Sequence, residues 1–108
     1  MPTVPTITPQ QLLHWQKEGV AFAFLDIREA HEVVVSRLTE LNIPMAFCLA
    51  RNAEIPRDLP VVIYCRTGGR SAATVSALMT KYRFENLYSL EGGIAGWFAH
   101  VNPEMEVG

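Results

Sequence analysis

One stretch of the chain combines a cysteine with a glycine-bearing turn and two arginines: Val61-Val62-Ile63-Tyr64-Cys65-Arg66-Thr67-Gly68-Gly69-Arg70-Ser71. The apolar, β-branched run before the cysteine predicts a buried strand, and a helical pattern begins at Ser71. In an open parallel sheet, ligands bind beyond the carboxyl ends of the strands, which is where this order places Cys65. A thiol in such a place favours an enzyme nucleophile over a structural cysteine.

The loop after Cys65 is suited to stabilising negative charge. Gly68 and Gly69 can adopt backbone conformations closed to other residues, so successive N–H groups can turn inward. The helix that follows the loop adds unpaired N–H groups and the positive end of its dipole. Arg66 and Arg70 add charge that no carboxylate within the loop cancels, which favours anion binding over a solvated-surface role. Together these features favour the thiolate form of Cys65.

Ionisation alone explains little of what such a loop could contribute. A cysteine pKa just below neutral raises the thiolate fraction by about 25-fold, but it lowers intrinsic nucleophilicity by about eightfold. A ring of N–H donors can instead stabilise an anion formed on the sulfur by several kcal/mol. We therefore predict that residues 66–71 wrap closely around Sγ of Cys65, hold such an anion and leave the sulfur reachable from solvent.

Strand and helix signals alternate along the rest of the chain. Thr8 and Gln11 form a capping-box pattern that predicts a helix ending near Gly19. The other predicted elements are a buried strand at 21–25 that ends at Asp26, one short helix within 28–37, a weak strand at 41–43, mostly loop with one helical turn over 44–60, a strand at 61–64, a helix over 71–83, a strand at 87–90 and a final helix after Gly92-Gly93. This alternation predicts one α/β domain over residues 1–108, with a mainly parallel central sheet and helices on both faces.

The composition narrows the class of protein. The chain has 108 residues, of which 49% are hydrophobic, so it can form one core without metal or disulfides. Its formal net charge of −2 argues against general binding of nucleic acid or a membrane surface, and no apolar stretch approaches membrane-spanning length. Two cysteines are too few for a disulfide scaffold, and the first residues lack a signal-peptide pattern, so we expect a reduced, cytoplasmic setting. We expect the protein to act as a monomer.

Other residues that could do chemistry have simpler explanations. Cys48 lies in an apolar stretch, which indicates packing rather than a second catalytic thiol. Asp26 and Arg28 follow a predicted strand, where they favour a structural ion pair or a loop brace, with Glu29 or Glu32 as candidate partners. The chain has three histidines, His14, His31 and His100. No metal-ligand spacing joins them to one another or to the cysteines, so we predict no metal site.

Three ordered segments carry a resemblance to a known family. They are Cys65-Arg66-Thr67-Gly68-Gly69-Arg70-Ser71, Leu25-Asp26-Ile27-Arg28-Glu29-Ala30-His31-Glu32 and Leu90-Glu91-Gly92-Gly93-Ile94-Ala95-Gly96-Trp97. They resemble, in that order, the active-site loop, the Asp-x-Arg-x-x-x-Glu segment and the closing Gly-Gly-x-x-x-Trp segment of the rhodanese-like sulfurtransferases. The resemblance implies a rhodanese-like fold, and it implies that Trp97, otherwise a core residue, also walls the active-site pocket.

The resemblance implies a persulfide cycle at Cys65 that needs no metal or organic cofactor. Cys65 would attack the outer sulfur of a small anionic donor such as thiosulfate and become Cys65–S–S⁻. The terminal sulfur would be cradled by the backbone amides of Arg66, Thr67, Gly68, Gly69, Arg70 and Ser71, while the two arginines attract the donor and help sulfite leave. A thiophilic acceptor would then take the sulfur: cyanide in an assay, and a thiol or a sulfur-carrier protein in cells.

One segment departs from the family pattern. Many relatives have a Gly-His-Ile-x-Gly-Ala stretch after the Asp-x-Arg segment, whereas this chain reads Ser36-Arg37-Leu38-Thr39-Glu40-Leu41-Asn42-Ile43-Pro44-Met45-Ala46. The chain therefore looks closer to rhodanese domains fused to enzymes that activate sulfur-carrier proteins. The departure leaves the subfamily and the physiological acceptor open.

Two other functions remain open. Cysteine phosphatases and arsenate reductases also use a cysteine in an anion-cradling loop, but those phosphatases place five residues between the cysteine and the arginine. Here four residues separate Cys65 from Arg70, and the shorter loop fits a sulfur atom better than a tetrahedral oxyanion. A non-catalytic docking module is the third alternative, although inactive relatives generally lack the cysteine.

Overall fold

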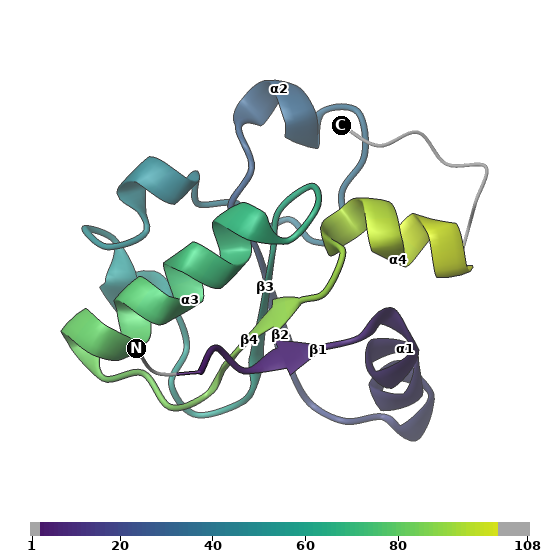
Figure 1. The fold of residues 1–108 in the computed structure, drawn as a ribbon, viewed down its shortest axis with the longest axis horizontal. Helices are drawn as coiled ribbons and strands as arrows, with labels where there is room; N and C mark the ends of the chain where they lie inside the picture. The colour runs from purple at the N-terminus through teal and green to yellow at the C-terminus, as the bar shows by residue number, and fades with distance from the viewer. Residues whose placement is uncertain (1–2, 102–108) are drawn as a thin grey trace.

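The computed structural model describes residues 3–101; residues 1–2 and 102–108, the ends of the predicted domain, lie outside the described part. Its strands and helices follow in the order β1 (Thr6–Ile7), α1 (Pro9–Glu18), β2 (Ala23–Asp26), α2 (Ala30–Val33), β3 (Val61–Tyr64), α3 (Gly69–Tyr82), β4 (Leu87–Leu90) and α4 (Gly93–Val101). Two short 3-10 turns, η1 (Met45–Phe47) and η2 (Asn52–Glu54), lie between α2 and β3. The strands occupy the centre of the molecule and the longer helices lie around them (Figure 1).

The four strands form one parallel sheet in the order β1-β4-β3-β2. β3 lies between β2 and β4, and all of its residues are buried. A strand covered on both faces is expected to read as a continuous apolar run, which is the pattern of Val61–Tyr64. The predicted α/β class with a mainly parallel sheet is confirmed.

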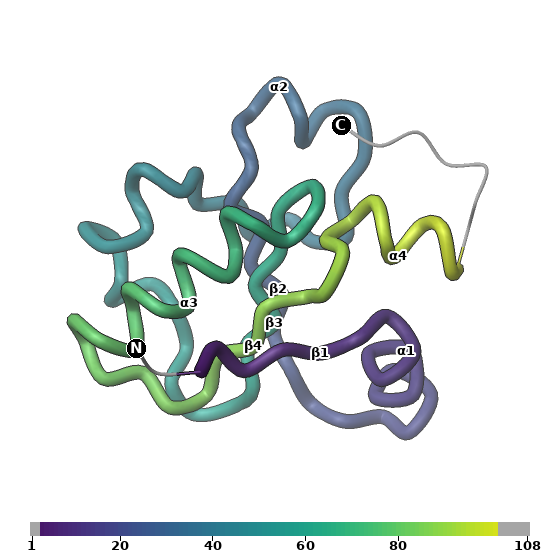
Figure 2. Tube along the Cα trace, viewed as in Figure 1, coloured from purple at the N-terminus to yellow at the C-terminus, as the bar shows by residue number. Residues whose placement is uncertain are grey.

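The two faces of β3 belong to two different apolar clusters. Successive side chains of a strand point to opposite faces, so residues with alternate numbers separate. The first cluster, on the face that α3 covers, includes Val61, Ile63, Cys65, Val75 and Leu78. The second cluster, on the face that α1 and α4 cover, includes Leu12, Val62, Tyr64, Ile94, Trp97 and Phe98. The Cα trace shows α3 on one side of the strands and both α1 and α4 on the other (Figure 2).

Caps fix the ends of the helices that flank the sheet. The backbone N–H of Gln11 donates to Oγ1 of Thr8 at 3.1 Å, and the Thr8 N–H donates to Oε1 of Gln11 at 2.9 Å, which confirms the predicted capping box. Gly19, with φ of 70°, ends α1 where the sequence predicts. α3 begins at Gly69 rather than Ser71, because Gly68 with φ of 108° turns the chain from the loop directly into the helix.

Four further details of the sequence prediction differ from the structure. The strand predicted at 21–25 is observed at Ala23–Asp26. The predicted strand at 41–43 is reduced to a single bridge between Asp26 and Asn42. The segment 44–60 contains two 3-10 turns instead of one helical turn. β1 was not predicted, because two residues between Pro5 and Pro9 are too few to show a strand period. No helix within residues 3–101 is long and apolar enough to cross a membrane.

Candidate functional site

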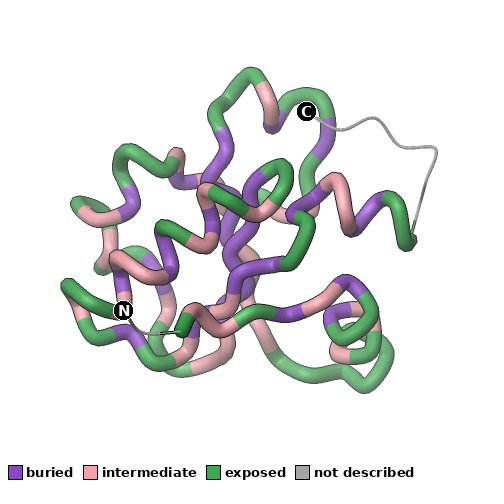
Figure 3. Tube along the Cα trace, viewed as in Figure 1, coloured by how far each residue is buried: buried purple, intermediate pink, exposed green. Residues whose placement is uncertain are grey.

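Cys65 follows the last residue of β3, at the carboxyl end of a strand with neighbours on both sides. The loop from Cys65 leads in four residues into α3. Its tip is exposed at Arg66, Thr67 and Gly69, above the buried residues of the strands, and buried segments lie at the centre of the trace in Figure 3. The chain therefore places the predicted nucleophile where a parallel sheet positions its ligands.

Backbone donors from the loop and from α3 converge on Sγ of Cys65. The Gly68 N–H donates to Sγ with a nitrogen–sulfur distance of 3.1 Å, and the Ser71 N–H donates at 3.4 Å. Oγ of Ser71 lies 3.6 Å from the same sulfur. The left-handed conformation of Gly68 lets the loop fold back so that its own N–H faces the sulfur three residues earlier. The inward turn of the peptide hydrogens is thus a feature of the described structure.

Opposing effects act on the pKa of the Cys65 thiol. Burial raises the pKa, because it disfavours the charged thiolate. The hydrogen bonds from the N–H and hydroxyl of Ser71 and from the N–H groups of Gly68 and Thr67 lower it, because they stabilise the thiolate. The hydrogen bonds outweigh burial, so the pKa of Cys65 lies below its ordinary value.

The prediction that the sulfur is left reachable from solvent is wrong for this structure. Cys65 as a whole is 1% exposed and packs in the first apolar cluster beside Ile63 and Val75. The same folding of the loop that brings N–H groups onto Sγ also covers it, since donors at hydrogen-bond distance occupy the space that water would fill.

The N-terminus of α4 holds the loop from the other side. The N–H of Ile94 donates to the carbonyl oxygen of Cys65 at 2.9 Å, and the N–H of Ala95 donates to that of Arg66 at 3.0 Å. In a planar trans peptide the N–H points opposite to the C=O. Fixing these two carbonyl groups therefore turns the N–H groups of Arg66 and Thr67 away from α4.

This contact depends on Gly93, which the sequence analysis placed in a turn and in the closing Gly-Gly-x-x-x-Trp segment without assigning it a contact with the Cys65 loop. A Cβ at Gly93 would lie 2.5 Å from the carbonyl oxygens of both Cys65 and Arg66, closer than real Cβ contacts allow. Gly93 also has φ of 60°, a conformation that favours glycine. The glycine thus permits the close approach of α4 to the loop.

Arg70 does not face its surroundings as a free cation, contrary to what the loop sequence suggests. Its Nη1 and Nη2 donate to Oε1 and Oε2 of Glu32 in α2, each at 2.8 Å. The bonds from Arg70 lower the pKa of Glu32 to about 2, so the carboxylate is ionised at neutral pH. The sequence analysis named Glu32 as a candidate partner of the Asp26–Arg28 pair; its carboxylate instead neutralises the loop arginine.

Asp26 and Arg28 form the predicted structural ion pair. Both side chains are fully buried, and Nη2 of Arg28 lies 2.8 Å from Oδ2 of Asp26. Arg28 also donates to the carbonyl oxygens of Ser36 at 2.5 Å and Glu32 at 3.5 Å, so the pair braces the segment that carries α2. Asn42 completes the brace by donating from Nδ2 to the carbonyl oxygens of Asp26 at 2.9 Å and Arg28 at 3.0 Å.

The remaining candidates separate into exposed and core residues. Arg66 is exposed at the loop tip, next to the sulfur-bearing residue. Trp97 is 5% exposed and packs in the second apolar cluster, on the opposite face of the sheet from Cys65, so the structure supports its core role and not a wall of the Cys65 site. Cys48 is buried, and burial raises its pKa to about 11, as packing predicts. Ser89, which the sequence analysis missed, shares a 2.7 Å hydrogen bond with Oγ of Ser71.

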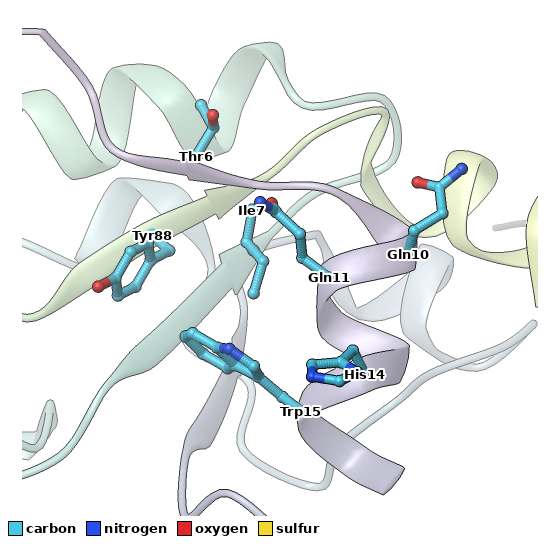
Figure 4. Close-up of a pocket in the computed structure, with 7 residues that line it drawn as sticks. All are labelled: Thr6, Ile7, Gln10, Gln11, His14, Trp15 and Tyr88. Atoms are coloured by element: carbon cyan, nitrogen blue, oxygen red, sulfur yellow. The ribbon is translucent and has the colours of Figure 1, made fainter. Parts of the chain in front are cut away.

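A separate pocket lies at the far edge of the sheet. It has a volume of about 470 Å³ and is lined by Thr6, Ile7, Gln10, Gln11, His14, Trp15 and Tyr88. These residues come from β1, α1 and β4, and none belongs to the loop after Cys65 (Figure 4). Among residues 3–101, no group of three or more His, Cys, Asp or Glu side chains is placed to hold a metal ion.

Comparison with known proteins identifies the family. The model of the rhodanese-like domain matches residues 8–100. A sulfurtransferase of Allochromatium vinosum is 38% identical over 80 residues, which cover 73% of this chain and 74% of that protein. The crystal structure of a rhodanese-related protein from Thermoplasma volcanium has a TM-score of 0.78 and 28% identity, covering 90% of this chain and 93% of that one.

A longer relative supports the predicted likeness to domains joined to activating enzymes. A probable adenylyltransferase/sulfurtransferase of Mycobacterium tuberculosis, MoeZ, is 33% identical over 103 residues, which cover 93% of this chain. This chain spans only 26% of the length of that relative. The family model covers most of the chain, and the sulfurtransferase relative is matched over most of its own length. The chain therefore belongs to the rhodanese-like domain family.

Proposed function

We propose that the protein is a sulfurtransferase that carries a sulfane sulfur as a persulfide on Cys65. The observation that carries the proposal is the convergence of the Gly68 and Ser71 N–H groups on Sγ, at 3.1 and 3.4 Å. These donors lower the pKa of a buried thiol, which burial alone would raise. A structural cysteine gains nothing from such donors, whereas a nucleophile gains the charge it needs.

The first step transfers one sulfur atom without net oxidation. Sγ of Cys65, as the thiolate, attacks the outer sulfur of a donor such as thiosulfate. A bond forms between the two sulfurs, the bond to the sulfonate sulfur breaks, and sulfite leaves with the electron pair: Cys65–S⁻ + S–SO₃²⁻ → Cys65–S–S⁻ + SO₃²⁻. In the second step the outer sulfur passes to a thiophilic acceptor and the thiolate returns.

The rest of the loop is proposed as the cradle of the outer sulfur. That atom lies about 2 Å beyond Sγ, the length of a sulfur–sulfur bond. The N–H groups at the start of a helix have no partner within the helix, and the loop from Arg66 to Ser71 leads directly into α3. The positive end of the helix dipole also favours an anion there. These groups stabilise Cys65–S–S⁻ until the acceptor arrives.

We propose a thiol or a sulfur-carrier protein as the cellular acceptor. The M. tuberculosis relative combines an adenylyltransferase with a sulfurtransferase in one name, which suggests that a rhodanese domain can act beside an enzyme that activates its acceptor. We further propose that residues 1–108 act as a single domain, as a monomer and in the cytoplasm. No cofactor is part of the proposed cycle.

Intact-mass measurement tests the proposal. The protein is incubated with thiosulfate in the absence of reductant, and a gain of one sulfur atom is expected in the wild type and in Cys48→Ala, but not in Cys65→Ser. Cys48→Ala is the matched control, because it removes the other buried thiol. Absence of the adduct together with hydrolysis of a phosphate ester would favour the phosphatase alternative, and absence of both activities would favour a docking module.

A further inference from the structure

The guanidinium of Arg70 is engaged by a carboxylate that the loop itself does not contain. Both of its terminal nitrogens bind Glu32 of α2, each at 2.8 Å, in a two-bond pairing. The side chain of Glu32 is 13% exposed and that of Arg70 is 36% exposed, so the contact is more sheltered than a surface ion pair. The charge that Arg70 presents to an approaching anion is therefore largely compensated.

Glu32 is held in place independently of Arg70. Its Oε1 accepts a hydrogen bond from the backbone N–H of Glu29 at 3.0 Å, which fixes the carboxylate at the start of α2. Its backbone carbonyl oxygen accepts from Arg28, whose own side chain is held by the buried carboxylate of Asp26. A residue fixed by so many partners loses little additional freedom when it binds Arg70.

The pair lies within electrostatic range of the reacting sulfur. The pKa of Arg70 is raised, mainly by its hydrogen bonds to Glu32, although burial lowers it. The charges of Glu32, Cys65 and Glu29 raise it further. Arg28 in turn acts by its charge on Glu32. The charges that act on Arg70 are thus those of two carboxylates and of Cys65, and the exposed Arg66 is the other loop cation.

We propose that Glu32 is a specificity-determining residue, which, by neutralising Arg70, makes the Cys65 site discriminate against dianionic sulfur donors relative to monoanionic donors of the same sulfur. This inference rests on the proposed function of Cys65. A donor with charge −2 gains about twice as much from a free cation as a donor with charge −1, so compensating that cation penalises the dianion more.

Two donors of matched chemistry test the inference. Thiosulfate is a dianion that releases sulfite, and methanethiosulfonate is a monoanion that releases methanesulfinate: Cys65–S⁻ + CH₃SO₂–S⁻ → Cys65–S–S⁻ + CH₃SO₂⁻. Both deliver one sulfane sulfur to Cys65, and in both the bond between that sulfur and the leaving group's sulfur breaks. The quantity to measure is the ratio of kcat/KM for thiosulfate to kcat/KM for methanethiosulfonate, with cyanide as the acceptor.

Glu32→Gln removes the charge and keeps the shape of the side chain and its acceptor for the Glu29 N–H. We expect the ratio to rise by about two- to fivefold at low ionic strength, the range that a partly exposed charge gives. The rise should shrink as salt is added, because the Debye length falls to about 10 Å at 0.1 M. Glu32→Ala, which also removes the charge, gives the same test should Glu32→Gln fold poorly.

Glu40→Gln is the matched control. It removes one carboxylate from an ion pair on the surface, where Glu40 is 84% exposed and lies 3.0 Å from Arg37, so the net charge of the protein changes equally. We expect its donor ratio to equal that of the wild type. The double variant Glu32→Gln/Arg70→Ala should lose the rise, because the freed cation is then absent.

An unchanged ratio in Glu32→Gln, or an equal loss for both donors, would overturn the inference and leave Glu32 a purely structural brace. That outcome differs from failure of the proposed function. If the wild type takes no sulfur from either donor, as judged by intact mass, the sulfurtransferase proposal fails. If it takes sulfur from both donors and Glu32→Gln leaves their ratio unchanged, only the specificity role fails.

Discussion

Sγ of Cys65 lies where burial and hydrogen bonding act on it in opposite directions, and the second cysteine provides an internal comparison. Cys48 and Cys65 are each 1% exposed. The nearest partner of the Cys48 sulfur is a carbonyl oxygen of Ile43 at 3.2 Å, which accepts a hydrogen bond and so favours the thiol. The sulfur of Cys65 faces N–H donors instead, which favour the thiolate. At equal burial, the pKa of Cys48 is therefore raised to about 11, whereas hydrogen bonds lower the pKa of Cys65.

Ser71→Ala should move the titration of Cys65 to higher pH. The substitution removes the hydroxyl that lies 3.6 Å from Sγ, one of the groups that lower the pKa of the thiol. We expect the midpoint to rise by about half to one pH unit, since one hydrogen bond contributes about 1 kcal/mol. Ultraviolet absorbance of the thiolate measures this without requiring a reagent to reach the buried sulfur, in a Cys48→Ala background.

Ser89→Ala is the control for that experiment. It also breaks the 2.7 Å bond between the two serine hydroxyls, but it removes no group that contacts Sγ. Its midpoint should move by less than that of Ser71→Ala. Equal midpoints for both variants would mean that the hydroxyl of Ser71 does not act on the thiolate directly.

At the scale of secondary structure, three elements fix the conformation of the loop. β3 places Cys65 at the carboxyl end of a central strand. α3 supplies the Ser71 N–H, and α4 binds the first two carbonyl groups of the loop. The Asp26–Arg28 pair adds a fourth constraint through α2, whose Glu32 holds Arg70. Breaking one partner of a fully buried pair typically costs about 3–5 kcal/mol, so the brace also stabilises the domain.

Gly93→Ala should damage both stability and sulfur transfer. A Cβ there meets the carbonyl oxygens of Cys65 and Arg66 at 2.5 Å, and φ of 60° disfavours alanine. We expect a loss of about 2–4 kcal/mol in the free energy of unfolding, from backbone strain and overpacking together. The folded fraction should load Cys65 with sulfur more slowly, because the loop must shift away from α4. Urea unfolding and the rate of persulfide formation are the two measurements.

Gly19→Ala separates the two causes. Gly19 has a similar φ of 70°, but a Cβ there meets nothing within 4 Å. We expect a loss of about 1 kcal/mol from backbone strain alone and an unchanged rate of persulfide formation. If Gly93→Ala loses no more stability and forms the persulfide no more slowly than Gly19→Ala, the contact between α4 and the loop does not contribute to sulfur transfer.

For the whole molecule, the features that could be predicted are those with a local signal. The capping box at Thr8 and Gln11 and the β-branched run at Val61–Tyr64 are encoded within a few adjacent residues. After that strand the chain turns at Gly68, where the turn requires a positive φ that glycine readily adopts. Strong local patterns of this kind predict both the α/β class and the position of Cys65 at the carboxyl end of a strand.

The features that could not be predicted arise from contacts distant in sequence. Glu32 and Arg70 are 38 positions apart, and nothing local indicates that the fold brings them together. The close approach of Gly93 to Cys65 likewise depends on how α4 packs, and the burial of Cys65 depends on how tightly the loop closes. The strand predicted at 41–43 was wrong in extent, because pairing with β2 is limited to the single bridge at Asn42.

Release of sulfite is the most direct measurement of sulfur transfer to Cys65. The protein is mixed with excess thiosulfate and no acceptor, and the sulfite set free is counted against the protein chains present. We expect a burst of one sulfite per chain that stops until cyanide is added, and no burst from Cys65→Ser. Sulfite release that is absent from the wild type, or that persists in Cys65→Ser, would contradict the persulfide at Cys65.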